Sequence, residues 1–238
     1  MSGILRGWLT DQNWETTLTW ANACGALAVS RHGCAPAYPS WQELQWLLEN
    51  GSEHKALRKD VLLEHVHWAT NRDNKVCPTE IADLRSLGND GAAPDGPMDF
   101  IGDWHQHRDL MYRAIDWNRW IGRSAIAGST DFREWPTAHC VVCPVGDASL
   151  DDLMKTCHAA RTQGLEVMLE LTSENDARLP SLLDGGVWPD YWILPAHGVA
   201  AQCELLLDKD PWCRGVYCAG GLGDEHGSIL GTVFVPQP

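Results

Sequence analysis

The chain has 238 residues, with 18 Lys plus Arg against 32 Asp plus Glu, so its formal net charge is −14. This length allows one sizeable core or two small ones. An acidic chain repels phosphate backbones, which argues against nucleic acid as a partner. No stretch approaches the roughly 20 apolar residues of a membrane helix, and the N-terminus lacks an apolar signal core. We therefore expect a cytoplasmic protein without a membrane partner.

The first part of the chain is predicted to be helical. Apolar residues recur at near-helical spacing over 14–30, which predicts a helix there. Ser40 is followed three residues later by Glu43, as in a capping box, and predicts a second helix over 41–49. The amphipathic pattern over 55–69 predicts a third helix.

Residues 71–98 are rich in Asp, Asn, Gly and Pro, which indicates a linker. Beyond it, short apolar runs alternate with helical stretches, a pattern typical of βαβ units and a parallel sheet. Strands are predicted over 139–145, 165–172, 190–194 and 215–220, and helices over 149–164, 177–184 and 199–208. The second half is therefore predicted to be α/β.

The run SGILRGWLTDQNWETTLTWANACGALAVSRHGCAPAYPSWQEL, residues 2–44, resembles the C-terminal end of ribokinase-type (PfkB) carbohydrate kinases. The nearest branch comprises the 5-dehydro-2-deoxygluconate kinases of inositol catabolism. In that family a Gly-Ala-Gly-Asp motif supplies the anion hole and the catalytic Asp, and the resemblance places it upstream of Ser2. Met1 would then correspond to an internal Met of a longer kinase. Residues 1–70 are accordingly expected to be a kinase remnant with little or no activity.

The kinase resemblance also implies ligand positions. Asn22 would lie beside the adenine of ATP, and the backbone carbonyls of Ala28, Arg31 and Gly33 would hold a monovalent cation near the anion hole. ATP, Mg²⁺ and K⁺ are the cofactors that the resemblance implies. A turn that presents several carbonyl oxygens suits a hard cation. The alternative is a structural helix and turn without nucleotide. We favour the alternative, because phosphoryl transfer depends on positioning and charge stabilisation that this segment does not supply by itself.

Six further pieces resemble, in the same order, a 5-dehydro-2-deoxyphosphogluconate aldolase-like (β/α)8 barrel that is fused behind the kinase in some bacterial proteins. They are WIGR (120–123), WPTAH (135–139), LEVMLEL (165–171), PDYW (189–192), DPWCRGV (210–216) and GSILGTVF (227–234). Such a barrel takes about 250 residues, and five or six strands are counted after the linker. We therefore predict an incomplete (β/α) TIM-barrel-like parallel sheet over 99–238. Its unpaired edges would favour self-association.

The barrel resemblance implies where aldolase chemistry would lie. A class I aldolase forms a Schiff base through a Lys, which the resemblance places at the positions of Val142 and Ile193, and neither is a Lys. Lys155 and Lys209 fall on predicted helices and are poorly placed to substitute. Glu170 matches an acidic residue at the end of its strand, where it could act as a general acid or base. The alternative, which we favour, is a structural carboxylate.

The C-terminal GSILGTVF resembles the phosphate-binding end of such barrels, so Gly231 and Thr232 are candidates for a weak anion site. The Arg of the family motif is absent. The alternative is a plain glycine turn before a strand.

Two clusters have the composition of metal sites. Asp103, His105 and His107 alternate and would share one face of a strand, and His with carboxylate suits zinc or iron. Cys140 and Cys143 have CxxC spacing but would face opposite sides of a strand. Neither cluster has a fourth ligand in the pattern, so we expect no metal site.

The leading hypothesis is therefore a truncated relative of the kinase–aldolase fusion, impaired in both halves. If it were active, its substrate would be a sugar acid or sugar phosphate. A second hypothesis is a non-catalytic assembly protein that forms a homo-oligomer or pairs with a full-length sugar kinase. A third is a residual lyase or isomerase that uses Glu170. The nine scattered Cys are expected to be reduced and mostly buried thiols.

Overall fold

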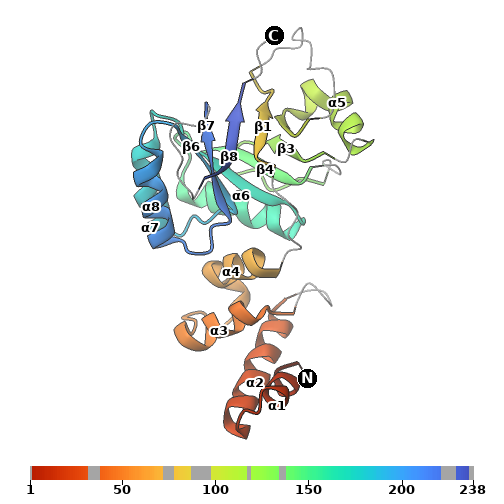
Figure 1. The fold of residues 1–238 in the computed structure, drawn as a ribbon, viewed down its shortest axis with the longest axis vertical. Coiled ribbons are helices and arrows are strands. Elements are labelled where there is room, and N and C mark those ends of the chain that lie inside the picture. The colour runs from red at the N-terminus through yellow and green to blue at the C-terminus, as the bar shows by residue number, and fades with distance from the viewer. Residues whose placement is uncertain are drawn as a thin grey trace. The chain divides into compact units, whose positions relative to one another are not determined.

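A computed structural model describes residues 2–31, 38–71, 78–86, 98–116, 119–133, 138–220 and 229–235. The chain divides into two compact units, Met1–Asn74 and Lys75–Pro238. The first unit is helical, and the second combines strands with helices (Figure 1). Within the described ranges, no helix is long and apolar enough to cross a membrane.

The described residues of the first unit form four α-helices and a short 3-10 helix. They are α1 (Ser2–Leu9), α2 (Trp14–Ser30), α3 (Trp41–Asn50), η2 (Leu57–Lys59) and α4 (Val61–Asn71). The predictions for α2 and α3 are confirmed, and the Ser40 side chain accepts the Glu43 N–H at 3.0 Å. The third helix, predicted over 55–69, is confirmed as α4, but it begins at Val61 and the 3-10 helix η2 precedes it. Asp60 accepts the Leu63 N–H at 3.0 Å and so starts a new helix after η2.

The sequence reasoning missed α1, which packs closely against α2. A Cβ on Gly3 would lie 2.6 Å from the backbone nitrogen of Ala21, and one on Gly7 would overlap the Thr17 side chain. Two glycines four residues apart lie on one face of a helix. They give α1 a surface without side chains, on which α2 makes its contact.

Three leucines form the buried apolar cluster of the helical unit: Leu27, Leu44 and Leu63. Tryptophan rings cover this cluster, with Trp20 and Trp41 in an edge-to-face arrangement at 4.8 Å between centroids. The guanidinium of Arg6 lies 3.7 Å from the centre of the Trp41 ring.

Eight parallel strands form a closed barrel in the second unit, in the order β1 to β8. They are β1 (Glu80–Asp83), β2 (Phe100–Gly102), β3 (Ile121–Ser124), β4 (Cys140–Pro144), β5 (Glu166–Glu170), β6 (Tyr191–Pro195), β7 (Gly215–Ala219) and β8 (Ile229–Phe234). The ring closes where Ile81 of β1 pairs with Val233 of β8. The prediction of an incomplete sheet with open edges is therefore wrong, and β1 lies inside the range predicted as a linker.

The helical layer explains how a short chain closes the barrel. Among the described residues, helices follow only β2, β4, β5 and β6, and they lie outside the strands (Figure 1). They are α5 (Trp104–Asp116), α6 (Leu150–Thr162), η3 (Asp176–Arg178) with α7 (Leu179–Asp184), and α8 (Val199–Lys209). Residues 125–133, which follow β3, contain no helix, so part of the shortfall in length lies in the helical layer and not, as predicted, in the number of strands.

Side chains from alternate positions fill the barrel, as the period of two in a strand requires. The inner cluster consists of Ile81, Ile101, Trp120, Cys140, Val142, Met168, Tyr191, Ile193, Tyr217 and Val233. A larger outer cluster, which includes Cys143, packs against helices α6, α7 and α8. Cys140 and Cys143 thus face opposite sides of β4, as predicted. The barrel interior is a packed core.

Seven cysteines lie in the described part of the chain, and all are free thiols, five of them buried. Burial, with a smaller contribution from the charge of Glu170, raises the pKa of the Cys143 thiol to about 12. A thiol that stays protonated is a poor nucleophile and metal ligand. The role of Cys143 is therefore packing.

Candidate functional site at the carboxyl ends of the strands

Charged side chains meet at the carboxyl-end rim of the barrel, where (β/α)8 barrels carry their ligand sites. Asp83 is the last residue of β1, and Glu170 is the last residue of β5. Each lies two positions after an inner-cluster residue, Ile81 and Met168 respectively, so both are at inward-facing positions.

Asp83 fixes the arginine that follows it by two positions. Its Oδ1 accepts the Arg85 backbone N–H at 3.0 Å and the Nε–H at 2.9 Å, and its Oδ2 accepts from Nη2 at 2.8 Å. An Asp that accepts from the backbone two residues later forms a tight turn. The turn and the two guanidinium bonds together orient the Arg85 side chain.

The opposite edge of the Arg85 guanidinium binds Glu170. Nη1 donates to Oε2 at 2.7 Å and Nη2 donates to Oε1 at 3.0 Å, which is the two-point geometry of strong arginine–carboxylate pairs. In a closed ring of eight strands, β1 and β5 are opposite one another. The ion pair therefore spans the mouth of the barrel.

These three side chains, the Asp83–Arg85–Glu170 triad, are each only 16% exposed. Burial lowers the pKa of the Arg85 guanidinium, but hydrogen bonds to Asp83 and Glu170 outweigh it and the net pKa is raised. Arg85 stays charged under all conditions in which the barrel folds. With both carboxylates ionised, the triad carries one net negative charge.

Asp103 and His107 lie at the same rim, directly after β2. The sequence placed both residues, with His105, on a strand, and this is wrong because Asp103 caps α5. Its Oδ1 accepts the His105 N–H at 2.8 Å. The three residues therefore do not share a strand face.

His107 is held in one tautomer. Its Nδ1 accepts the backbone N–H of Asp103 at 3.1 Å, so Nε2 carries the proton of the neutral ring. Burial lowers the pKa of His107, while the nearby charges of Asp103 and Asp83 oppose that shift. α5 is kinked at this residue, with φ −114° and ψ 20°. The neutral ring can donate one proton at the rim through Nε2.

The two positions expected to carry a Schiff-base Lys face the barrel interior. Val142 and Ile193 belong to the inner cluster, and both are fully buried. Lys155 and Lys209 lie on α6 and α8 and form surface ion pairs with Asp151 and Asp184. Among the described residues, no Lys lines the interior or the rim.

Gly231 and Thr232 lie within β8, and not in a turn at a helix N-terminus. The Thr232 N–H donates to the Thr79 carbonyl at 2.9 Å, and a Cβ on Gly231 would overlap that carbonyl. The Thr232 donor that the resemblance assigned to phosphate is therefore used to close β8 onto β1.

The residues carried over from the kinase family lie in the helical unit. Asn22 is exposed on α2, Ala28 is in the last turn of that helix, and Arg31 is its C-cap. Gly33 lies outside the described residues. The structure therefore does not test the cation site.

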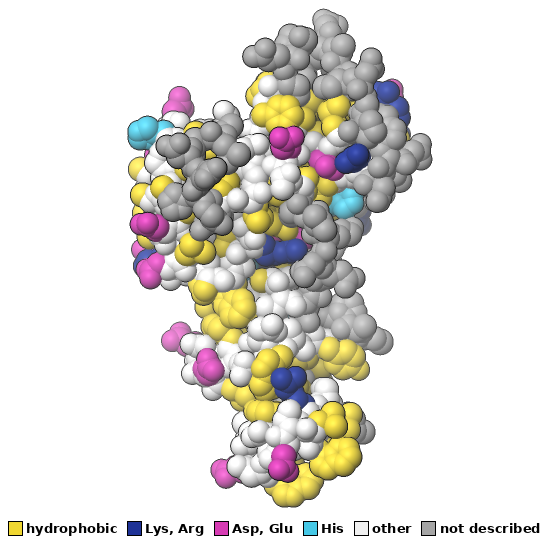
Figure 2. All heavy atoms as spheres, viewed as in Figure 1, with side chains coloured by type: hydrophobic (Ala, Val, Ile, Leu, Met, Phe, Trp, Pro, Cys, Tyr) yellow, Lys and Arg dark blue, Asp and Glu magenta, His cyan; other side chains and the backbone are white. Residues whose placement is uncertain are grey.

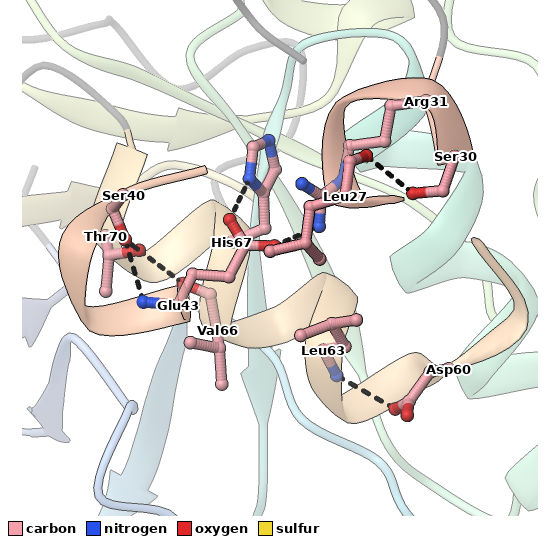
Figure 3. A network of polar contacts seen from close by, with 10 residues as sticks. All are labelled: Leu27, Ser30, Arg31, Ser40, Glu43, Asp60, Leu63, Val66, His67 and Thr70. Carbon is pink, nitrogen blue, oxygen red and sulfur yellow. Dashed lines mark hydrogen bonds and ion pairs between the residues drawn. The ribbon is translucent and has the colours of Figure 1, made fainter. Parts of the chain in front are cut away.

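The Arg31 side chain takes part in a buried polar network (Figure 3). It donates to Oε1 of Glu43, whose Oε2 lies 2.8 Å from Nδ1 of His67. Glu43 is fully buried. Ser40, which caps α3, also lies 2.6 Å from the Thr70 hydroxyl of α4. This network joins α2, α3 and α4 and serves the fold of the helical unit.

The described ranges contain no group of three His, Cys, Asp or Glu side chains arranged to hold a metal ion. No family model matches the sequence, and no curated protein matches it. The resemblance to the barrel family identified Glu170, whereas Asp83 and Arg85 were missed. The apolar residues Ile81, Ala82 and Leu84, which lie around Asp83 and just before Arg85, were the available signal for a strand within the predicted linker.

Proposed function

We propose that the chain is a diverged relative of the kinase–aldolase fusion proteins of inositol catabolism, without Schiff-base aldolase activity and without sugar kinase activity. The closed parallel barrel supports this proposal, because a (β/α)8 barrel is the architecture of the aldolase half that the sequence resembles. The ordered motifs from WIGR to GSILGTVF support it from the sequence.

One observation carries the catalytic part of the proposal. Val142 and Ile193 are fully buried in the apolar inner cluster, at the positions where the resemblance places the reactive Lys. A Schiff base needs a deprotonated amine beside the substrate carbonyl. Neither Val nor Ile supplies one, and Glu170 is bound at both oxygens by Arg85.

Borohydride trapping tests the aldolase half. The purified chain is incubated with dihydroxyacetone phosphate or pyruvate and reduced with sodium borohydride, and its intact mass is then measured. We expect no adduct, because a reduced imine requires a reactive amine next to the bound carbonyl. A single stoichiometric adduct that maps to one Lys by peptide mass would contradict the proposal.

A coupled phosphorylation assay tests the kinase half. The chain is supplied with ATP, Mg²⁺, K⁺ and 5-dehydro-2-deoxygluconate, and ADP release is measured beside a thermal melt with the same ligands. We expect neither turnover nor a rise in melting temperature, since a ligand that binds the folded state raises that temperature. Turnover that Asn22→Ala abolishes would contradict the proposal.

A second candidate function is an assembly partner of a full-length sugar kinase. It is favoured by large apolar side chains exposed on the helical unit, among them Trp8 at 73%, Leu9 at 75% and Val29 at 84%. Figure 2 shows hydrophobic side chains gathered on the surface of this unit. Exposed apolar surface of this kind marks contact sites. Co-purification with such a kinase that is lost in Trp8→Glu/Leu9→Glu would support this function, and its persistence in the variant would refute it.

A further inference from the structure

Arg85 has the geometry of a residue that binds an acidic ligand, but Glu170 of the same chain is bound to its guanidinium. Its Nε and one Nη2 hydrogen bond go to Asp83, so its orientation is fixed by a residue two positions away. Its second edge, formed by Nη1 and Nη2, reaches across the mouth to Glu170. A guanidinium with one edge fixed and the other directed to a carboxylate is the arrangement by which proteins bind organic acids.

The barrel does not need the Arg85–Glu170 bond to close. β1 is already paired in parallel with β2 on one side and with β8 on the other, and β5 is paired with β4 and β6. Partly burying an additional ion pair costs desolvation, so such a pair is weak evidence for stability. The bond also lies at the rim where barrels bind ligands, and not in the apolar interior.

We propose that the second edge of Arg85 is a binding subsite for the carboxylate of a small organic acid, and that Glu170 occupies this subsite when the acid is absent. An incoming carboxylate takes the place of the Glu170 carboxylate on Nη1 and Nη2. Glu170 is 16% exposed at the rim and turns its charge to solvent on displacement. Asp83 keeps the guanidinium in place throughout the exchange.

Charge favours a carboxylate over a phosphate at this subsite. Asp83 already balances the charge of Arg85, so a monoanion that replaces Glu170 leaves the charge around the guanidinium unchanged. A phosphate carries more negative charge than a carboxylate near neutral pH and adds repulsion from Asp83. The neutral His107 lies at the same rim, with its Nε2 proton available as a donor to a hydroxyl of the acid. A hydroxy acid is therefore the expected class of ligand.

The test is titration calorimetry with glycerate, using glycerol as the neutral probe of the same skeleton and inorganic phosphate as the second anion. Wild type is compared with Glu170→Gln, which keeps the shape and removes the competing charge. We expect glycerate to bind Glu170→Gln about ten-fold more tightly than wild type. Glycerol should bind neither protein, and phosphate should bind more weakly than glycerate.

Arg85→Lys in the Glu170→Gln background is the matched control, because Lys keeps the charge but not the two-point edge. The gain in glycerate affinity should disappear in this double variant. A gain that persists there, an equal gain for glycerol, or phosphate binding as tight as that of glycerate overturns the proposal. If Glu170→Gln only lowers the melting temperature and binds no better, the ion pair is structural and the proposal fails.

Glu170→Asp keeps the test decisive if Glu170→Gln does not fold. The shorter side chain retains its charge but withdraws it from Arg85 by one methylene. A smaller gain in glycerate affinity is expected, and the absence of any gain counts against the subsite. The inference does not depend on the proposed kinship, because its readout is binding, whereas the kinship is tested by imine trapping and phosphorylation.

Discussion

The Glu43 network of the helical unit and the Asp83–Arg85–Glu170 triad of the barrel differ in how far their carboxylates are buried, although the barrel also contains a fully buried pair, Arg161 with Asp190. In the helical unit, Glu43 is fully buried and is bound by Arg31 and His67 inside a core whose apolar cluster has three leucines. In the barrel, the Asp83–Arg85–Glu170 triad lies at the carboxyl-end rim, above the apolar inner cluster, and each of its side chains keeps some exposure. Removing a charge should therefore damage the fold in the first unit. At the rim of the barrel it should mainly change binding.

The largest expected effect is that of Glu43→Ala on the helical unit. The substitution leaves the buried His67 and the partly buried Arg31 without their carboxylate, and breaking a buried pair on one side costs about 3–5 kcal/mol of unfolding free energy. Hydrogen exchange read by mass spectrometry should show lost protection in α2, α3 and α4, with the barrel strands unchanged.

Glu49→Ala is the matched control for Glu43→Ala. Glu49 is exposed on the same helix, α3, so its removal should change the free energy of unfolding by less than about 0.5 kcal/mol. Equal effects of the two substitutions would show that the buried network does not stabilise the unit.

Ile193→Ala tests the contrasting core of the barrel. Ile193 is fully buried in the inner cluster, and truncating such a side chain costs about 2–5 kcal/mol through lost transfer energy and a cavity. Urea unfolding should show the loss as a lower midpoint with an unchanged slope. Leu207→Ala, at a position 57% exposed on α8, should be nearly neutral. A nearly neutral Ile193→Ala would mean that the barrel interior is not packed.

Glycine substitutions sharpen the comparison within the helical unit. Gly7→Ala places a Cβ against the Thr17 side chain and should separate α1 from α2, at a cost of about 1–3 kcal/mol. Gly25→Ala is the control, because a Cβ there meets no atom within 4 Å, and it should stabilise the helix by about 0.5–1 kcal/mol. Thermal melts of both variants should therefore shift in opposite directions, and equal shifts would disprove the α1–α2 contact.

The sequence allowed prediction of elements whose signals are local. The capping box at Ser40 and the helical periodicity over 14–30 predicted α3 and α2, and the apolar run over 139–145 predicted β4. Closure of the barrel was not predictable in the same way. β2 has three residues, too few to show a period, and its stability comes from pairing with β1 and β3.

The candidate site could likewise be predicted only where its signal is local in the sequence. Glu170 was identified because it matches an acidic residue at the end of a strand in the resembled barrel family, and strand ends carry the ligand sites of barrels. Its partner Arg85 lies 85 positions away and follows a four-residue strand in a segment rich in turn-forming residues. No local pattern marks such a pair, because only the closed ring brings β1 opposite β5.

The smallest expected effect is that of an exposed ion pair, Asp131 with Arg133, in the segment after β3. Hydrogen bonds from the Arg133 side chain and backbone lower the pKa of Asp131 to about 2, from an ordinary value of 3.8. Because the folded pKa is depressed, this pair contributes stability above about pH 3.8, and the contribution is lost as the pH falls through about 2.

NMR titration of the Asp131 carboxyl should give the low pKa in wild type and a value near 3.8 in Arg133→Gln. High salt should also weaken the shift, since both groups are exposed to solvent. An unchanged pKa in Arg133→Gln would show that the backbone N–H alone holds the carboxylate. Removing the Asp131–Arg133 pair should leave the thermal melt at neutral pH almost unchanged, because exposed pairs contribute little to stability. Removing Glu43, in contrast, should lower the stability of the helical unit.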